Sequence, residues 1–351
     1  MSLIATYLQD IRVSHPSNLD KNELRTTRVG LLEMALNQTS GSNSLLSPDL
    51  QSKAVESEGR NLDVPVMTKG SITIENTRSC TVGGGESDSA LVRVVWKTVR
   101  VDIAMVKAQY AKNDVKYLYD LNKKIRESVE ALNVEMESDL ETALDASKSQ
   151  VYGSTIVTSK YAVVANTIRA TESQLDFFFN DLDAINFADD FYNDEVYVVG
   201  NHTIMPYVSK FVNQGGNNDE NQSFQFAGKN FTFTNRITNG SGVNATGYFM
   251  PDGSIAMLSR VAIDARMGHK ATDGTEWSEE RIPGLPFPVG VMYKSSCSDQ
   301  KALNGAGLEH LEATMVEHWQ MSYDYAIVVP YNSDLATQAS AIRKFEFIPN
   351  A

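Results

Sequence analysis

The sequence has few of the residues from which metal centres and disulfide frameworks are built. Its two cysteines, Cys80 and Cys297, lie far apart and outside any metal-ligand spacing, a usage that fits a reducing cytosol. Among its five histidines, His310 and His318 stand in the densest cluster of acids. Their separation does not match the i, i+4 spacing with which two imidazoles on a helix share a zinc ion. We therefore expect no metal site and no cofactor.

Motifs for nucleotide binding and covalent catalysis are also missing. The triplet Gly83–Gly85 follows a strand-like run, but neither a Lys-Ser/Thr pair nor a helix comes after it. A flexible hairpin tip is therefore favoured over a phosphate loop. No nucleophile elbow occurs, and neither cysteine has the local context of an activated nucleophile. These absences disfavour an enzyme.

The sequence also lacks long apolar runs and an excess of positive charge. Its first ten residues do not resemble a signal peptide, and no run approaches the roughly 18 apolar residues of a membrane-spanning helix. With 31 basic and 44 acidic residues, the net charge is −13, which repels nucleic acid and anionic lipid. A sequence-reading nucleic-acid binder is disfavoured. The inner wall of a DNA container would tolerate this charge, and so would any soluble cytoplasmic protein.

Residues 1–63 are polar and broken. Their leucines allow one short amphipathic helix over 22–36, and a Ser/Asn/Gly run with turn composition follows over 37–47. Two interpretations stay open. The segment is either a partly disordered terminus or an arm that orders only against a neighbouring molecule.

A long two-stranded ribbon is predicted next. The run 71–77 alternates with Ile72 and Ile74 on one face, and the run 91–101 alternates after the glycine tip. In the second strand Val92, Val94 and Trp96 share a face, whereas Arg93 and Lys97 point the other way. Such a ribbon is marginally stable alone in water, so something must cover its apolar face.

The strongest periodic signal predicts a helix over 114–147, on the order of 50 Å long. Apolar residues recur every three or four positions there and form a single stripe. A coiled coil would need sustained heptads with paired e and g charges, so a helix laid across a sheet is favoured. The stripe consists of Leu118, Leu121, Ile125, Val129, Leu132, Met136, Leu140 and Leu144.

The remaining two hundred or so residues read as mixed α and β structure. Pro251-Asp252-Gly253 has the composition of a tight turn, because proline presets φ and glycine accepts positive φ. The segment 308–320 is ambiguous, with strand favoured from Met315 on. We expect helices near 155–167, 171–187 and 204–213, a buried strand at 196–200, a hairpin over 248–257, and long strands at 286–293 and 323–329.

The order of these features resembles major capsid proteins of tailed phages with the Hong Kong 97 fold. A polar arm leads through the segment 60–67 to a ribbon with a glycine-rich tip, one very long helix, and a mixed region that ends in the strand 323–331. The resemblance implies an α+β fold of four parts. These are an N-terminal arm (1–63), an extended loop (64–105), a peripheral domain with a spine helix (106–160 and 285–331) and a mixed α/β axial domain (161–284 and 332–351).

The resemblance also implies a function. The chain would assemble with itself into hexamers and pentamers of an icosahedral shell, formed in the host cytoplasm and found in the virion. The shell would enclose double-stranded DNA without sequence-specific binding. Some members carry a cleaved scaffolding segment of about a hundred residues. Here roughly 60 residues precede the ribbon, so a separate scaffolding protein is implied, with a portal and room for decoration proteins. Lys69 has no matched partner for the Lys–Asn cross-link of some members.

Other functions stay open at this point. An encapsulin-like compartment would share the fold and would need a groove for cargo. A β-rich tail or receptor-binding virion protein usually shows trimeric repeats or β-helical periodicity, and neither is visible here. A cytoplasmic hydrolase would need the catalytic motifs that are missing. The acids Asp181, Asp183, Asp189 and Asp190 could hold a divalent cation, but no EF-hand loop is present, so a solvated helix face is favoured.

Charge along the long helix suggests subunit contacts. Its first half is basic, whereas the segment 127–145 carries only acids, an order that opposes the helix dipole. Either these charges are simply solvated, or the acidic half is a docking track for the basic face of a neighbour's ribbon. The candidate contact residues are Ile72, Ile74, Arg78, Val92, Arg93, Val94, Trp96, Lys97, Glu135 and Glu137.

Overall fold

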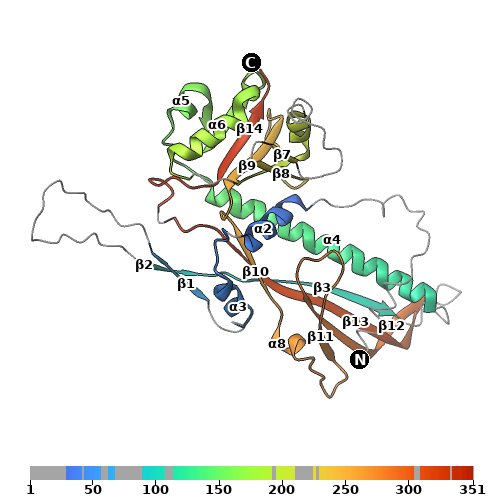
Figure 1. Ribbon diagram of the computed structural model, residues 1–351. Helices are drawn as coiled ribbons and strands as arrows, with labels where there is room; N and C mark the ends of the chain where they lie inside the picture. The colour runs from blue at the N-terminus through green and yellow to red at the C-terminus, as the bar shows by residue number, and fades with distance from the viewer. Residues whose placement is uncertain are drawn as a thin grey trace, which may run out of the picture.

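The computed structural model describes most of the chain. The described residues are 29–41, 43–56, 62–67, 89–106, 114–191, 195–209, 224–226, 229–303, 309–332 and 334–350. They form an α+β fold of two large sheets, a two-stranded ribbon and one long helix, α4. Figure 1 shows α4 extended beside strands β3, β12 and β13, with the second sheet and helices α5 and α6 grouped beyond its C-terminal end.

Helix α4 spans Asp114–Ser147, as its periodicity predicts. Seven residues of the apolar stripe are buried, and Leu118 packs partly buried against them. The same core cluster contains Ile103 of β3 and Trp319 and Tyr323 of β13. The predicted helix across a sheet is therefore confirmed. No helix within the described ranges combines the length and apolarity needed to cross a bilayer.

The sheet beneath α4 has five antiparallel strands. Its central strand β13 (Glu309–Val328) pairs with β12 (Val289–Leu303), which pairs with β11 (Glu276–Glu280). Two further strands pair with β13. These are β3 (Lys97–Val106), along residues 316–325, and β10 (Ala256–Arg260), along residues 324–328. The strand predicted at 286–293 begins later, at Val289, and runs on to Leu303. The strand predicted at 323–329 is the end of β13, which begins before Met315.

The second sheet has seven strands. Their order is β4 (Ala162–Val164), β5 (Thr167–Thr171), β14 (Arg343–Ile348), β9 (Ala245–Pro251), β6 (Val196–Asn201), β8 (Lys229–Thr234) and β7 (Phe224–Phe226).

Helix α6 (Leu175–Ala188) packs its aromatic side chains against this sheet. Phe178 meets Phe345 and Phe347 of β14, with ring centroids 5.2 Å apart in each pair. The predicted helix near 171–187 and the buried strand near 196–200 are confirmed. Of the helix expected at 204–213, the structure has a 3-10 turn, His202–Ile204, followed by helical residues 205–209, and residues 210–213 lie outside the described part of the chain.

The helix predicted over 155–167 is wrong beyond its first turns. Helix α5 (Thr155–Lys160) ends early, and β4 and β5 then form a hairpin. Ala165 and Asn166 both have positive φ, 49° and 60°, as a two-residue hairpin turn requires. Residues 163, 164 and 168 are β-branched, and pairing with β14 gives them a sheet to join.

The hairpin predicted over 248–257 is also wrong, although its turn is present. Gly253 has φ +78°, yet β9 belongs to the seven-stranded sheet and β10 to the five-stranded sheet. The backbone after the turn forms hydrogen bonds with side chains of helix α2 (Gly30–Ser40) instead of with β9. Gln38 accepts hydrogen bonds from the backbone of residues 254 and 255 at 2.9 and 3.1 Å, and the Thr39 hydroxyl accepts one from Met257 at 2.8 Å.

The N-terminal segment from residue 29 packs against its own chain. Helix α2 (Gly30–Ser40) buries Leu31, Leu32 and Met34 in the main core, and helix α3 (Pro48–Glu56) follows. The interpretation of an arm that orders only against a neighbour is therefore wrong for 29–41 and 43–56, whereas a partly disordered terminus stays a prediction. Residues 22–28 of the expected helix lie outside the described part of the chain.

The ribbon pairs β1 (Asp63–Met67) with β2 (Ser89–Arg93) and projects from the body (Figure 1). The strand predicted over 91–101 is divided at 94–96, where the chain passes from the ribbon into the five-stranded sheet. The strand expected at 71–77 lies outside the described residues. The sheets also cross the expected domain boundaries, because β3, β10 and β11 share a sheet with β12 and β13.

Candidate subunit interface

The division of the predicted strand buries Val94. Its side chain is 6% exposed and lies in a small cluster with residues of α3, β10 and β13, and its N–H donates to the Leu62 carbonyl at 2.9 Å. The expectation that Val94 lies on an uncovered apolar face is therefore wrong. Elements of the same chain cover it, and the sequence alone could not place them beside the ribbon.

Trp96 is held at the base of the ribbon. The Arg260 guanidinium stacks over its ring at 4.2 Å from the centroid. The Arg260 Nε donates to an Asp324 carboxylate oxygen at 2.9 Å, and the Thr98 hydroxyl donates to the other oxygen at 2.7 Å. These contacts join β3, β10 and β13, so Trp96 is packed against the five-stranded sheet where the ribbon begins.

The ribbon exposes the face opposite to the one predicted. Val92 and Val64 are half-buried, whereas Leu91 is 73% exposed and stands opposite the exposed Pro65 in register. Val95, just beyond β2, is 79% exposed. The outward face of the ribbon and of the residues just beyond it is therefore apolar at Pro65, Leu91 and Val95. Ile72, Ile74 and Arg78 lie outside the described residues.

Charges on the ribbon are paired within the chain. The Arg93 Nε donates to Asp63 across the ribbon at 2.9 Å. The Lys97 amine bonds Glu135 at 2.6 Å and Asp139 at 2.7 Å on α4. Partial burial lowers the pKa of Lys97, but the hydrogen bonds to Asp139 and Glu135 raise that pKa above its ordinary value overall. The attraction predicted between the ribbon and the acidic half of the helix thus exists for Lys97, but inside one subunit.

Of the two interpretations left open for the acidic half of α4, simple solvation and a docking track, neither fits all of its acids. Glu137 is fully buried, beneath α2 and β8. Asp145 bonds Lys344 at 2.7 Å and Lys148 at 2.9 Å. Burial raises the pKa of Asp145, but the two lysines lower it by more, to about 2. The asymmetry that opposes the helix dipole is therefore offset in part by lysines after the helix and on β14.

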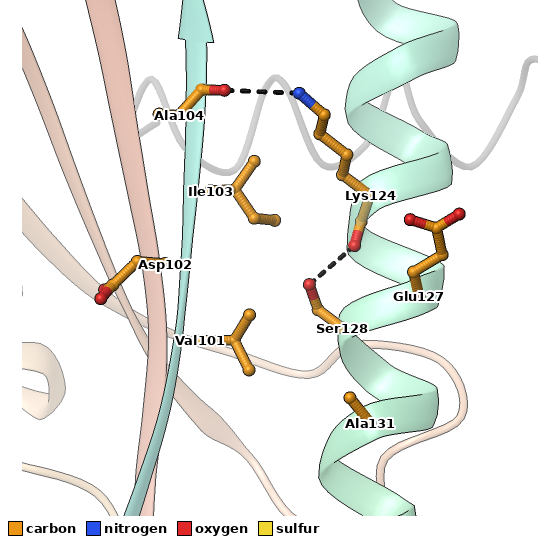
Figure 2. A pocket seen from close by; sticks show the side chains of 8 residues that line it. All are labelled: Val101, Asp102, Ile103, Ala104, Lys124, Glu127, Ser128 and Ala131. Carbon is orange, nitrogen blue, oxygen red and sulfur yellow. Dashed lines mark hydrogen bonds between the residues drawn. The ribbon is translucent and has the colours of Figure 1, made fainter.

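A cleft of about 380 Å³ opens where β3 crosses α4. In Figure 2, Val101 and Ile103 point from the strand towards the helix, and Lys124 spans the gap. The Lys124 amine reaches the Ala104 carbonyl at 3.4 Å and Asp120 at 3.3 Å. The cleft is thus partly closed by a paired lysine. Nothing in its lining forms a nucleophile–base pair.

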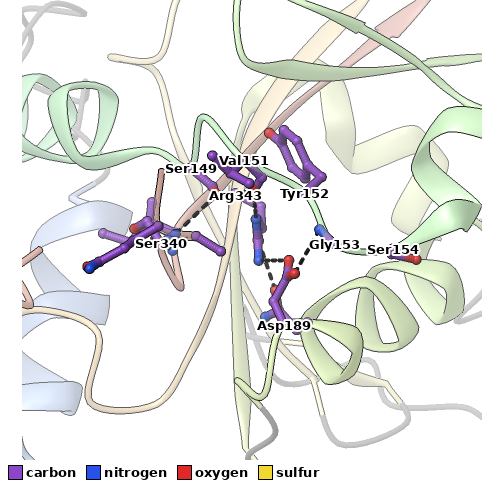
Figure 3. A network of polar contacts seen from close by, with 12 residues as sticks. Ser149, Val151, Tyr152, Gly153, Ser154, Asp189, Ser340 and Arg343 are labelled. Carbon is purple, nitrogen blue, oxygen red and sulfur yellow. Dashed lines mark hydrogen bonds and ion pairs between the residues drawn. The ribbon is translucent and has the colours of Figure 1, made fainter. Parts of the chain in front are cut away.

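A buried ion pair joins the end of α6 to β14, and the sequence offered no sign of it (Figure 3). The Arg343 and Asp189 side chains are 0% and 6% exposed and meet at 2.5 Å. The guanidinium also donates to Asn186 and to the Val151 carbonyl, both at 3.1 Å, and the Gly153 N–H donates to Asp189 at 2.8 Å. The network fastens the linker after α4 to the seven-stranded sheet.

Three of the four acids considered for a cation, Asp181, Asp183 and Asp189, form ion pairs. Asp181 accepts from Lys160 and Tyr161, and Asp183 pairs with the buried Lys229. The solvated face favoured for this group is wrong for Asp189. In the part of the chain that the structure describes, no three His, Cys, Asp or Glu side chains gather as a metal site.

Comparison with known proteins gives likeness in structure but not in sequence. No protein-family model matches the sequence, and no curated protein matches it. A chain from the capsid of Ralstonia phage GP4 is similar with a TM-score of 0.50 and 9% identity, over 96% of this chain and 95% of that chain. A chain from Mycobacterium phage Che8 is similar with a TM-score of 0.50 and 8% identity, over 95% of each chain.

At these identities the likeness shows the fold. The chain has the α+β fold of a phage capsid structure over nearly its whole length, which confirms the resemblance to phage capsid proteins at that level. The narrower assignment to the Hong Kong 97 fold stays a prediction.

Proposed function

We propose that this chain is a phage major capsid protein, which assembles with itself into a closed icosahedral shell around double-stranded DNA. The near-complete structural likeness to the GP4 capsid chain carries the proposal. A structural role also fits a molecule whose described cleft holds no catalytic arrangement. The net charge of −13 suits a wall that must enclose DNA without binding it.

The ribbon is the proposed contact with a neighbouring copy. A thin ribbon with Leu91 and Val95 exposed is a liability in a monomer, and a neighbour that covers it would remove the exposed apolar surface. From the candidate set, Val92, Arg93, Trp96, Lys97 and Glu135 stay proposed, either at the contact or at its base. Val94 and Glu137 leave the set because the subunit's own interior buries them. Ile72, Ile74 and Arg78 stay predictions.

The proposal extends to partners and domains. Hexamers and pentamers would form the shell, with a separate scaffolding protein and a portal taking part in assembly in the host cytoplasm. The seven-stranded sheet with α5 and α6 would be the axial domain. The five-stranded sheet with α4 would be the peripheral domain, now including β3, β10 and β11.

Electron microscopy of the expressed chain, alone and with the neighbouring phage structural genes, tests the function. Closed particles or rings of five and six subunits are expected. A monodisperse monomer under both conditions would overturn the proposal, and particles filled with protein cargo would indicate a compartment.

The ribbon contact is tested separately by the double variant Leu91→Ser with Val95→Ser. Both side chains are exposed in the subunit, so circular dichroism and the urea midpoint should match the wild type. Particle yield in sedimentation should fall sharply. Normal shells from this variant would refute the ribbon contact while leaving the capsid function standing.

A further inference from the structure

Glu137 is a fully buried acid at the meeting point of three elements. It projects from the C-terminal half of α4 and is 0% exposed. One carboxylate oxygen accepts a hydrogen bond from the Leu32 N–H at 2.8 Å, and the other accepts one from the Thr234 hydroxyl of β8. The side chain therefore ties α2 and β8 to α4.

The contact supplies the N-terminal cap that helix α2 lacks. The residue at the cap position, Val29, makes no side-chain hydrogen bond to the helix, and the first N–H groups of a helix need acceptors. Glu137 provides them from another element. Gly30 sits so close to β8 that an added Cβ would lie 2.2 Å from the Phe233 carbonyl oxygen. The start of α2 is thus pressed against β8 and the carboxyl group.

Glu137 accepts hydrogen bonds from several donors and forms no ion pair with a described lysine or arginine. Burial raises its pKa to about 7, although hydrogen bonds from Thr234 and the backbone of Leu32 and Leu31 act against the rise. The charged group that faces it from α2 is Glu33, which raises the pKa further, and β8 contributes only the uncharged Thr234. Ionising Glu137 while α2 is packed over it therefore costs free energy. That cost falls when α2 moves away and water reaches the carboxylate.

We propose that Glu137 is a proton-controlled latch for helix α2, which holds residues 29–40 most tightly when the carboxyl is protonated and lets them open more readily when it is ionised. In the protonated form one oxygen still accepts from Leu32, and the O–H donates to the Thr234 hydroxyl, which can act as acceptor. The latch depends on contacts within the subunit and not on the proposed function.

The latch also reaches the connection between the two sheets. Gln38 and Thr39, near the other end of α2, hold the backbone of residues 254–257 by hydrogen bonds. When α2 opens, these N–H groups lose their partners. The turn that carries the chain from β9 to β10 should therefore exchange its amide hydrogens together with α2.

The direction of the pH effect follows from the raised pKa. The stabilising contribution is complete below the ordinary pKa of 4.5 and is lost as pH rises through about 7. With these two values, opening of α2 should become about tenfold more frequent between pH 6 and pH 8.

Hydrogen exchange of the full chain, followed by mass spectrometry and corrected for intrinsic exchange, tests the latch. Peptides covering 30–40 and 252–258 should both show the tenfold change in the wild type. Glu137→Gln should abolish it. Glu127→Gln, which removes the same charge from an exposed site on α4, should retain it. Wild-type exchange that is indifferent to pH, or a pH effect that survives Glu137→Gln, would overturn the proposal.

A second variant keeps the test decisive if Glu137→Gln does not fold. Thr234→Val keeps the shape of the side chain but removes a hydrogen bond that lowers the Glu137 pKa. The pH midpoint of the exchange change should then move upward. An unchanged midpoint in Thr234→Val would contradict the latch.

Discussion

Asp189→Asn should destabilise the subunit severely, because it leaves the Arg343 charge without its counter-ion in the interior. The Arg343 side chain is 0% exposed and its partner 6% exposed, so water cannot replace the lost carboxylate. Removing one member of such a buried pair costs about 3–5 kcal/mol. The exposed pair between Lys97 and Glu135, at 43% and 53% exposure, should contribute only about 0–1 kcal/mol.

The assay is urea unfolding of the unassembled subunit, followed by circular dichroism. Asp190→Asn is the matched control, because it makes the same chemical change at the next residue, which is exposed and has φ 62°, and asparagine tolerates that backbone conformation. The midpoint should fall strongly for Asp189→Asn and hardly move for Asp190→Asn.

Two results would refute this reasoning. One is a loss below about 1 kcal/mol for Asp189→Asn, the range of an exposed pair. The other is an equal loss in the control. The double variant Arg343→Met with Asp189→Leu adds an independent check, since replacing both charges by apolar groups should recover much of the stability.

Two further predictions concern α4. Leu140→Ala, at a fully buried position of the stripe, should lower the free energy of unfolding by about 2–5 kcal/mol; a change in urea midpoint no larger than that of the exposed substitution Thr142→Ala would argue against a packed helix–sheet core. Because the pKa of Asp145 is lowered to about 2, its contribution should be present above its ordinary pKa and be lost as pH falls from about 4 towards 2. The midpoints of wild type and Asp145→Asn should therefore differ near neutral pH and converge in acid, and a difference independent of pH would contradict this.

Much of the regular structure follows from local pattern. The stripe from Leu118 to Leu144 predicts both the bounds of α4 and the face that it buries, because a period near 3.6 aligns those side chains whatever they pack against. The aromatic helix α6 and the apolar strand β6 are predicted for the same reason. Glycine at 253 predicts a turn, since a residue without a Cβ adopts positive φ at no steric cost.

Glu137 shows where local pattern stops. It lies one position beyond Met136 of the stripe and four beyond Asn133, which is also buried and donates to the Gly284 carbonyl at 2.9 Å. Polar residues at this spacing beside an apolar stripe are a signal that the buried arc of a helix is wider than the stripe. The sequence could have suggested this, but not that α2 and β8 supply the donors.

The tertiary structure decided which segments meet. The Pro-Asp-Gly turn is compatible with a hairpin, yet the backbone after it donates hydrogen bonds to Gln38 and Thr39, and β10 joins the other sheet. Val94 belongs to an alternating run, but α3 and β10 cover its side chain. Arg343 pairs with Asp189, which lies 154 residues earlier in the sequence. Periodicity and turn chemistry act over a few neighbouring residues, so the sequence by itself determined the elements. Burial and charge pairing depend on partners that come together only when those elements pack. The packing of the elements therefore decided which face of the ribbon is exposed, which charges form the buried ion pair and which groups contact Glu137.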